Sequence, residues 1–229
     1  MKKYKIVILW DWDNTLVDTF EAIWKAQNDM RIHYGLEPWS KKEAKNAMNT
    51  SGRNLIKNLV GEDKATEARA FYLDRYAVHA QSIQLKDGAL DLLNFAKQNG
   101  FCCVLASNKA GTILKSEVSR QMPLDTFDLI IGAEEAPEDK PSKVFTDKAL
   151  ENFTYDCVVS IGDGASDIKM GHNYKNGISI LVFSDPTSSE FKDNVPDYAC
   201  ATLNDVKNIL QNVITQKELT RHLTQSNCR

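Results

Sequence analysis

The stretch that decides the fold is KIVILWDWDNTLVD, residues 5–18, where an apolar run ends on two acids, Asp11 and Asp13. The run over 5–10 is continuous rather than alternating, which is typical of a strand buried on both faces of a parallel sheet. Two carboxylates one residue apart repel each other unless a cation or a chemical task stabilises them. The stretch therefore predicts a buried strand whose carboxyl end carries functional side chains.

The rest of the chain alternates between strand-like and helical patterns. Further apolar runs occur at 101–106, 128–133, 157–162 and 178–183, and helical patterns cover 88–100, 142–153 and 204–214. This alternation predicts an α/β protein with a Rossmann-like, doubly wound parallel sheet. Between the first two runs, the patterns at 19–33, 40–48, 53–60 and 63–80 predict helices only. We therefore expect a core of residues 1–16 and 86–229, interrupted by an all-helical cap at 17–85.

Composition excludes several classes of function. The 229 residues include 28 basic and 31 acidic side chains, a net charge of −3, which argues against nucleic-acid binding driven by bulk charge. Five cysteines with no CxxC pair predict neither a disulfide framework nor a zinc site, and they favour a reducing cytoplasm. No apolar stretch is long enough to span a membrane. We expect a cytoplasmic monomer or homodimer that binds neither nucleic acid nor membrane.

Polar residues gather where the predicted strands end, the edge at which open parallel sheets bind ligands. Beyond the two acids of the first strand, these residues are Ser107, Asn108, Lys140, Asp163 and Asp167. Converging acids need a cation, and carboxylates together with a substrate phosphate suit Mg²⁺. A carboxylate is already ionised at neutral pH and can attack phosphorus, while a second acid moves the proton. A lysine and a hydroxyl would hold the phosphate.

Four short motifs occur in a fixed order along the chain: DWDNTLVD (11–18), SNK (107–109), KP (140–141) and GDGASD (162–167). Together they resemble the four motifs of the haloacid dehalogenase superfamily of phosphohydrolases. The helical insert is similar to the C1 cap of the subfamily that includes phosphoglycolate phosphatases and β-phosphoglucomutases. The segment PDYACATLNDV (196–206) resembles that subfamily's closing strand and helix.

The resemblance implies a role for each matching residue. Asp11 would be the nucleophile that forms an aspartyl-phosphate, and Asp13 would be the acid/base. Ser107 and Lys140 would hold the phosphoryl group. The implied ligands of Mg²⁺ are Asp11, Asp13 (through its main-chain carbonyl) and Asp163, with Asp167 either as a further ligand or as a residue that supports the ligands. Because dehalogenases lack the second aspartate of the first motif, the resemblance implies phosphate chemistry rather than carbon–halogen cleavage.

Four positions carry secondary expectations. We expect Asn108, and Arg53 of the cap stretch TSGRN (50–54), to contact substrate. Lys109 is expected to face solvent. Asn14 stands where the family most often has Gly, and asparagine can adopt the positive φ that a glycine would supply.

The function expected from this pattern is Mg²⁺-dependent hydrolysis of a small phosphorylated metabolite, in the manner of a phosphoglycolate phosphatase. Two alternatives stay open: a phosphomutase of the β-phosphoglucomutase type and a non-catalytic phosphate-binding protein. A third, carbon–phosphorus cleavage through a Schiff-base lysine, would require a buried lysine in the cap, whereas the cap lysines lie in polar surroundings.

Overall fold

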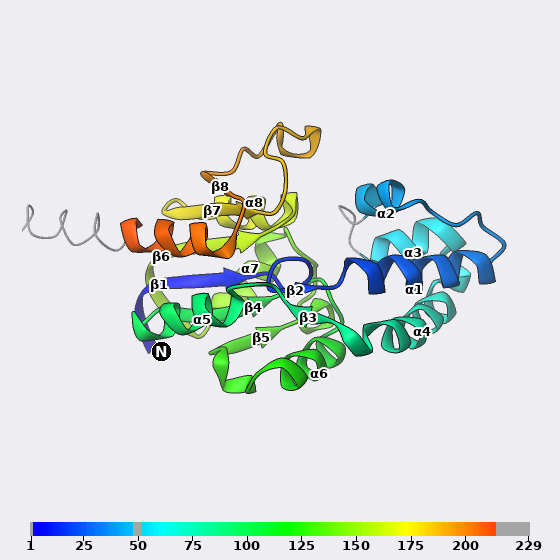
Figure 1. The fold of residues 1–229 in the computed structure, drawn as a ribbon, viewed down its shortest axis with the longest axis horizontal. Helices are drawn as coiled ribbons and strands as arrows, with labels where there is room; N and C mark the ends of the chain where they lie inside the picture. Colours follow the sequence, from blue (N-terminus) through cyan, green and yellow to red (C-terminus); the bar gives the residue numbers. More distant parts are fainter. Residues whose placement is uncertain (1, 48–51, 214–229) are drawn as a thin grey trace, which may run out of the picture.

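The computed structural model describes residues 2–47 and 52–213. Its main sheet has six parallel strands in the order β5-β4-β1-β6-β7-β8, so that β1 lies inside the sheet (Figure 1). The strands are β1 (Lys2–Trp10), β4 (Cys102–Ala106), β5 (Leu129–Ile131), β6 (Phe153–Gly162), β7 (Gly177–Val182) and β8 (Tyr198–Cys200). The predicted α/β, Rossmann-like sheet is confirmed.

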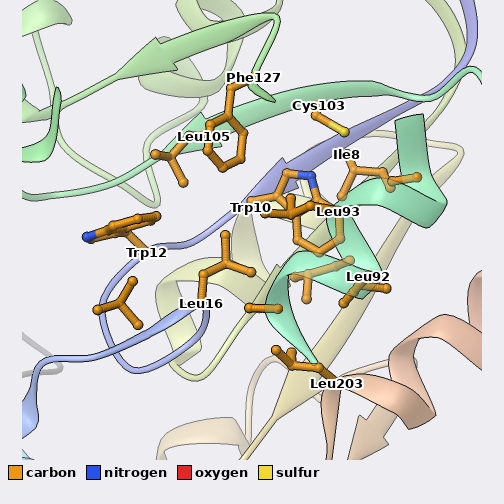
Figure 2. Close-up of a cluster of buried hydrophobic side chains, with 14 of the residues drawn as sticks. Ile8, Trp10, Trp12, Leu16, Leu92, Leu93, Cys103, Leu105, Phe127 and Leu203 are labelled. Carbon is orange, nitrogen blue, oxygen red and sulfur yellow. The ribbon is translucent and has the colours of Figure 1, made fainter. Parts of the chain in front are cut away.

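Both faces of the sheet are covered, which explains the continuous apolar run in β1. Ile8 and Trp10 point into one layer, where they pack with Leu92 and Leu93, as Figure 2 shows. Val7 and Leu9 belong to the opposite layer. The first layer contains α5 (Ala89–Gln98), α6 (Gly111–Gln121) and the helix at 203–213, and the second contains α7 (Lys143–Leu150) and α8 (Ala165–His172).

Two strands are longer than the sequence pattern predicts. The strand expected at 5–10 begins at Lys2, and the helix expected through residue 153 ends at Leu150, so that β6 starts at Phe153. The reason is their mutual pairing, because Lys2 lies opposite Phe153 in the parallel register. Each strand extends the other through backbone hydrogen bonds, which depend little on side-chain pattern.

Within its described residues, the inserted segment contains four α-helices, which lie beyond one end of the sheet (Figure 1). They are α1 (Phe20–His33), α2 (Lys41–Ala47), α3 (Gly52–Val60) and α4 (Glu62–His79). They have a small apolar core of their own around Met30, Ile56 and Ala68.

The chain enters and leaves this helical segment through two short paired strands. β2 (Val17–Asp18) and β3 (Gln84–Leu85) pair in antiparallel fashion. The Lys86 amide also donates a hydrogen bond to the Leu16 carbonyl, at 2.9 Å. We propose that residues 17–85 form the cap and that this strand pair is its connection to the core.

Candidate active site

A tight loop follows β1 and carries the first pair of acids. The Asp11 amide donates to the Ile161 carbonyl at 2.9 Å, which keeps the start of the loop beside β6. Asn14 has a φ of 60°, in the left-handed region that asparagine tolerates, as expected from the sequence. The Thr15 hydroxyl donates to Oδ2 of Asp11 at 3.1 Å, so this carboxylate is fixed from within its own loop.

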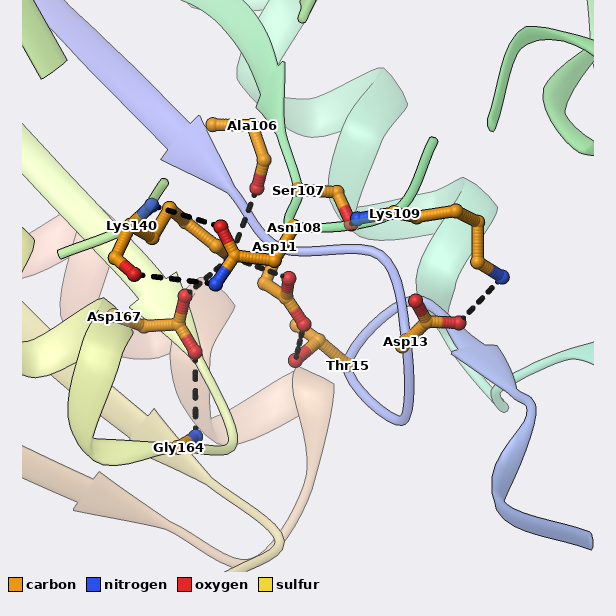
Figure 3. Close-up of polar contacts among 10 residues, drawn as sticks. All are labelled: Asp11, Asp13, Thr15, Ala106, Ser107, Asn108, Lys109, Lys140, Gly164 and Asp167. Carbon is orange, nitrogen blue, oxygen red and sulfur yellow. Dashed lines mark hydrogen bonds and ion pairs between the residues drawn. The ribbon is translucent and has the colours of Figure 1, made fainter. Parts of the chain in front are cut away.

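Lys140 joins the first motif to the last. Its Nζ lies 2.6 Å from Oδ1 of Asp11 and 2.7 Å from Oδ1 of Asp167, and it donates to the Ala106 carbonyl at 3.0 Å (Figure 3). All three charged side chains are buried. Burial alone would lower the pKa of Lys140, but the two carboxylates outweigh that effect and raise it. The lysine is therefore charged where it contacts the predicted nucleophile.

The residues of the second motif support this arrangement. Ser107 is buried directly after β4, and its hydroxyl accepts a hydrogen bond from the Lys109 amide at 3.1 Å. The Asn108 amide group contacts the backbone of Lys140, with Oδ1 accepting from its N–H at 2.8 Å and Nδ2 donating to its carbonyl at 3.2 Å. The described contacts of Asn108 therefore hold the lysine loop in place. The Arg53 side chain lies outside the described residues.

Three of the predicted metal ligands come together. Carboxylate oxygens of Asp11, Asp163 and Asp167 lie within 4.8 Å of one another. Burial raises the pKa of Asp11 to about 7, although Lys140 acts in the opposite direction. Burial and the neighbouring carboxylates also raise the pKa of Asp163 well above its ordinary value. Excess buried negative charge of this kind fits a divalent cation with oxygen ligands.

Asp13 lies apart from that group, and its surroundings correct one expectation. Its Oδ1 is 2.7 Å from Nζ of Lys109 (Figure 3). The Lys109 side chain is only 8% exposed, so the expectation that it faces solvent is wrong. The charges of Asp13 and of Glu117, a buried residue of α6, draw this lysine inward, and Glu117 also lies 2.7 Å from its Nζ.

A cavity of about 740 Å³ lies over these residues, between the strand ends and the helical segment. Core residues on its wall include Asp11, Asp13, Ser107, Lys140, Asp163 and Asp167. The helical segment contributes Ile23, Gln27, Ile56, Arg69, Tyr72 and Tyr76. The cavity therefore brings the acids of the first and fourth motifs to one space that can admit a small molecule.

Comparison with known proteins identifies the class to which this fold belongs. The family model of haloacid dehalogenase-like hydrolases matches residues 8–182. A hydrolase of the haloacid dehalogenase-like family from Streptococcus pneumoniae has a similar structure, with a TM-score of 0.73 and 19% identity over 90% of this chain and 98% of that one. A hydrolase from Pseudomonas syringae gives a TM-score of 0.74 at 16% identity, over 90% of this chain and 98% of that one. These likenesses show the shared fold.

The chain belongs to the haloacid dehalogenase-like hydrolases. Among its relatives, a phosphoglycolate phosphatase from Nitrosococcus oceani is 25% identical over 92% of this chain and 98% of its own length. A phosphoglycolate phosphatase from Rhodobacter capsulatus is 23% identical over 84% of this chain and 90% of its own. The expectation of a phosphatase of this family is confirmed.

Lys109 and its two hydrogen-bond partners, Glu117 and the Tyr76 hydroxyl, were not among the predicted site residues. Lys109 belongs to the recognised SNK motif, but only its serine and asparagine had an expected contact. Glu117 and Tyr76 carry no local signal, because an acid and a tyrosine within helical patterns are usually partly exposed. Only the tertiary structure brings these residues beside the first motif.

Proposed function

We propose that this protein hydrolyses a phosphomonoester of a small metabolite, with Mg²⁺ and through an aspartyl-phosphate on Asp11. The observation that carries the proposal is the placement of Asp11 at the wall of the cavity, 2.6 Å from the Lys140 ammonium and within the group of three acids. Asp11, Asp163 and Asp167, with the Asp13 main-chain carbonyl, would hold the metal ion. When bound, Mg²⁺ supplies positive charge that offsets both the carboxylates and the phosphate.

The proposed reaction has two steps. In the first, a carboxylate oxygen of Asp11 bonds to phosphorus, the bond from phosphorus to the leaving oxygen breaks, and protonated Asp13 gives that oxygen its proton. In the second, a water molecule attacks the phosphorus of the aspartyl-phosphate while Asp13 takes the water's proton. The bond between phosphorus and the Asp11 oxygen breaks, so that inorganic phosphate leaves and the Asp11 carboxylate is restored. Ser107 and Lys140 hold the phosphoryl oxygens throughout.

We propose phosphoglycolate as the first substrate to test, because relatives that match over most of their length are phosphoglycolate phosphatases. The helical segment at 17–85 would act as a cap that shields the cavity from water during the first step. A phosphomutase would use the same nucleophile but return the phosphoryl group to a sugar, so the products distinguish the two functions.

The chemistry of the cysteines supports a reducing compartment such as the cytoplasm. Cys102, Cys103, Cys157 and Cys200 are free thiols and are buried. In the part of the chain that the structure describes, no helix combines the length and the apolar character needed to cross a membrane. A monomer or homodimer remains the predicted state.

The test is a panel of phosphorylated metabolites, phosphoglycolate and hexose phosphates included, with release of inorganic phosphate measured in the presence and absence of Mg²⁺. Asp11→Asn keeps the shape of the side chain but removes the nucleophile, so we expect phosphate release to fall by at least about 1,000-fold. The matched control is Asp147→Asn, which changes an exposed acid paired with Lys143. Wild-type turnover by Asp11→Asn would refute the proposal, and isomerised hexose phosphate without free phosphate would replace it with the mutase.

A further inference from the structure

A second lysine with a buried side chain lies on the cap side of the cavity, where it has two hydrogen-bond acceptors and one ion-pair partner. Nζ of Lys109 lies 2.7 Å from Oδ1 of Asp13, 2.7 Å from Oε2 of Glu117 and 2.7 Å from the Tyr76 hydroxyl. An ammonium group has three protons and no acceptor. Three partners from three different segments of the chain therefore determine where this lysine lies.

Glu117 acts as the fixed end of this network. Its side chain is fully buried in α6, where an unpaired carboxylate would be strongly destabilising. The same oxygen that contacts Lys109 also accepts a hydrogen bond from the indole N–H of Trp12, at 2.7 Å. Trp12 is fully buried and adjoins Asp13 in the sequence. Glu117 thus holds the first-motif loop through Trp12 and directs Lys109 toward Asp13.

The contact has a direct consequence for proton transfer. The Asp13 side chain is 21% exposed and lines the cavity, so without a partner it could adopt several rotamers. Lys109 restrains Oδ1 of Asp13, and the Asp13 carboxyl group remains at the wall of the cavity. Its positive charge also offsets the negative charge that Asp13 carries once it has given up its proton.

Tyr76 connects the same lysine to the cap. It lies near the carboxyl end of α4, close to where the chain returns to the core, and is 2% exposed. Besides the hydrogen bond from Lys109 to its hydroxyl, the ammonium lies 4.5 Å from the centre of its ring. A movement of α4 relative to the core would therefore change the surroundings of Lys109.

We propose that Lys109, anchored by Glu117, is the residue that positions Asp13 for proton transfer, and that Tyr76 couples this positioning to the placement of the cap. The inference rests on the proposed function, because it assumes that Asp13 is the acid/base. Lys109 is a positioning residue in this scheme, since it acts on the substrate through Asp13.

The test compares substrates that differ in their need for an acid. In the first step, an alkyl phosphate needs a proton on its leaving oxygen, whereas p-nitrophenyl phosphate does not. In the second step, the attack of water needs a base with either substrate. For Asp13→Asn we expect kcat on the alkyl phosphate to fall about 100-fold or more. With p-nitrophenyl phosphate we expect a burst of about one equivalent of nitrophenolate, followed by slow turnover.

Lys109→Met should reproduce this pattern in weaker form, with a loss of about 10- to 100-fold on the alkyl phosphate and a detectable burst. Because this variant leaves Glu117 buried without its cation, the double variant Lys109→Met, Glu117→Gln serves as the second test. The matched control is Lys115→Met, which changes an exposed lysine of the same helix as Glu117. A folded double variant with the wild-type ratio of alkyl to aryl rates and no burst would overturn the inference.

The coupling to the cap has its own variant. Tyr76→Phe should lower kcat on the alkyl phosphate about three- to tenfold and leave the first turnover of p-nitrophenyl phosphate unchanged. Tyr174→Phe is the control, because that hydroxyl donates to Asp147 on the surface. Equal alkyl rates for Tyr76→Phe and wild type would remove the cap from the inference.

If Asp13→Asn itself does not separate the two substrates, the acid/base assignment fails, whereas failure of the Lys109 variants alone leaves the proposed function intact.

Discussion

Two buried lysines lie on opposite sides of the first motif, and each contacts two carboxylates at about the same distances. Lys140 contacts Asp11 and Asp167, with a third acid, Asp163, close by. Lys109 contacts Asp13 and Glu117. After their proposed roles, we call the first set the nucleophile cluster and the second, with Tyr76 and Trp12, the acid/base cluster.

The two clusters differ in how their negative charge is offset. The nucleophile cluster has three acids and one lysine, a formal charge of −2, and burial raises the pKa of Asp11 to about 7. The acid/base cluster has two acids and one lysine, a formal charge of −1, with one neutral donor, the Trp12 indole, and one neutral acceptor, the Tyr76 hydroxyl. The first arrangement therefore fits an added cation, whereas in the second the protein's own lysine and two neutral side chains leave a smaller excess of negative charge.

The largest expected effect comes from removing Lys140. In Lys140→Met, Asp11 and Asp167 lose their cation, so we expect kcat to fall at least about 1,000-fold. Without metal, the free energy of unfolding should fall by about 3–5 kcal/mol, because a buried pair has lost one partner. Mg²⁺ should restore part of this stability, since it offsets the same carboxylates. Phosphate release and denaturation with urea, each with and without Mg²⁺, measure both effects.

Lys143→Met is the control for that experiment. Lys143 pairs with Asp147 on the surface, so its loss should change the free energy of unfolding by less than about 0.5 kcal/mol. If the two variants were equally stable in the absence of metal, the excess of negative charge assigned to the nucleophile cluster would be wrong.

A second change alters the geometry of the nucleophile cluster without changing its charge. A Cβ added at Gly162 would lie 2.1 Å from Cγ of Asp167, so Gly162→Ala must displace this carboxylate. We expect the Mg²⁺ concentration for half-maximal activity to rise about 10- to 100-fold. Gly164→Ala is the control, because its nearest neighbour would be 3.7 Å away. Equal Mg²⁺ requirements in both variants would remove Asp167 from the proposed ligands.

A third change tests how the acid/base cluster contributes to the stability of the protein. Trp12→Phe removes the indole donor to the buried Glu117, so we expect a loss of about 1–3 kcal/mol in the free energy of unfolding. Trp24→Phe is the matched control, because its indole donates to a neutral acceptor, the Trp39 carbonyl, in a partly buried position. If Trp24→Phe destabilised the protein more than Trp12→Phe, the anchoring role of Glu117 would lose its support.

Much of the nucleophile cluster could be predicted from the sequence, because each of its residues follows a strand and parallel strands end at the same edge. The acid/base cluster could not. Lys109 lies in a loop of polar residues, which usually indicates exposure, and Glu117 is 105 residues from Trp12 along the chain. No periodic pattern relates an indole in one loop to a carboxylate in a distant helix. The short strands β2 and β3 were not predicted for a similar reason, since two residues are too few to form a pattern.

The smallest expected effect comes from an acid in the proposed cap that is partly exposed to solvent. Oδ2 of Asp29 in α1 lies 2.8 Å from Nε of Arg75 and 2.7 Å from Nε2 of His79, both in α4, and its side chain is 33% exposed. Partial burial opposes the charged form, but the hydrogen bonds from His79 and Arg75 outweigh it and lower the pKa of Asp29. Because Asn keeps the shape but not the charge, Asp29→Asn should lose about 0.5 kcal/mol near neutral pH.

The direction of its pH dependence follows from the lowered pKa. The folded state favours ionised Asp29, so its contribution to stability is present above the ordinary aspartate pKa of about 3.9 and is lost as the pH falls through the lower folded value. The difference in unfolding free energy between wild type and Asp29→Asn should therefore shrink from about pH 5 toward about pH 2. Urea denaturation across that range measures it, with Asp74→Asn, an exposed acid of α4, as the control. A difference that grew in acid would mean that the Asp29 carboxylate is stabilised in its neutral form, as burial alone would require. Asp29 would then resemble the carboxylates of the nucleophile cluster rather than contrast with them.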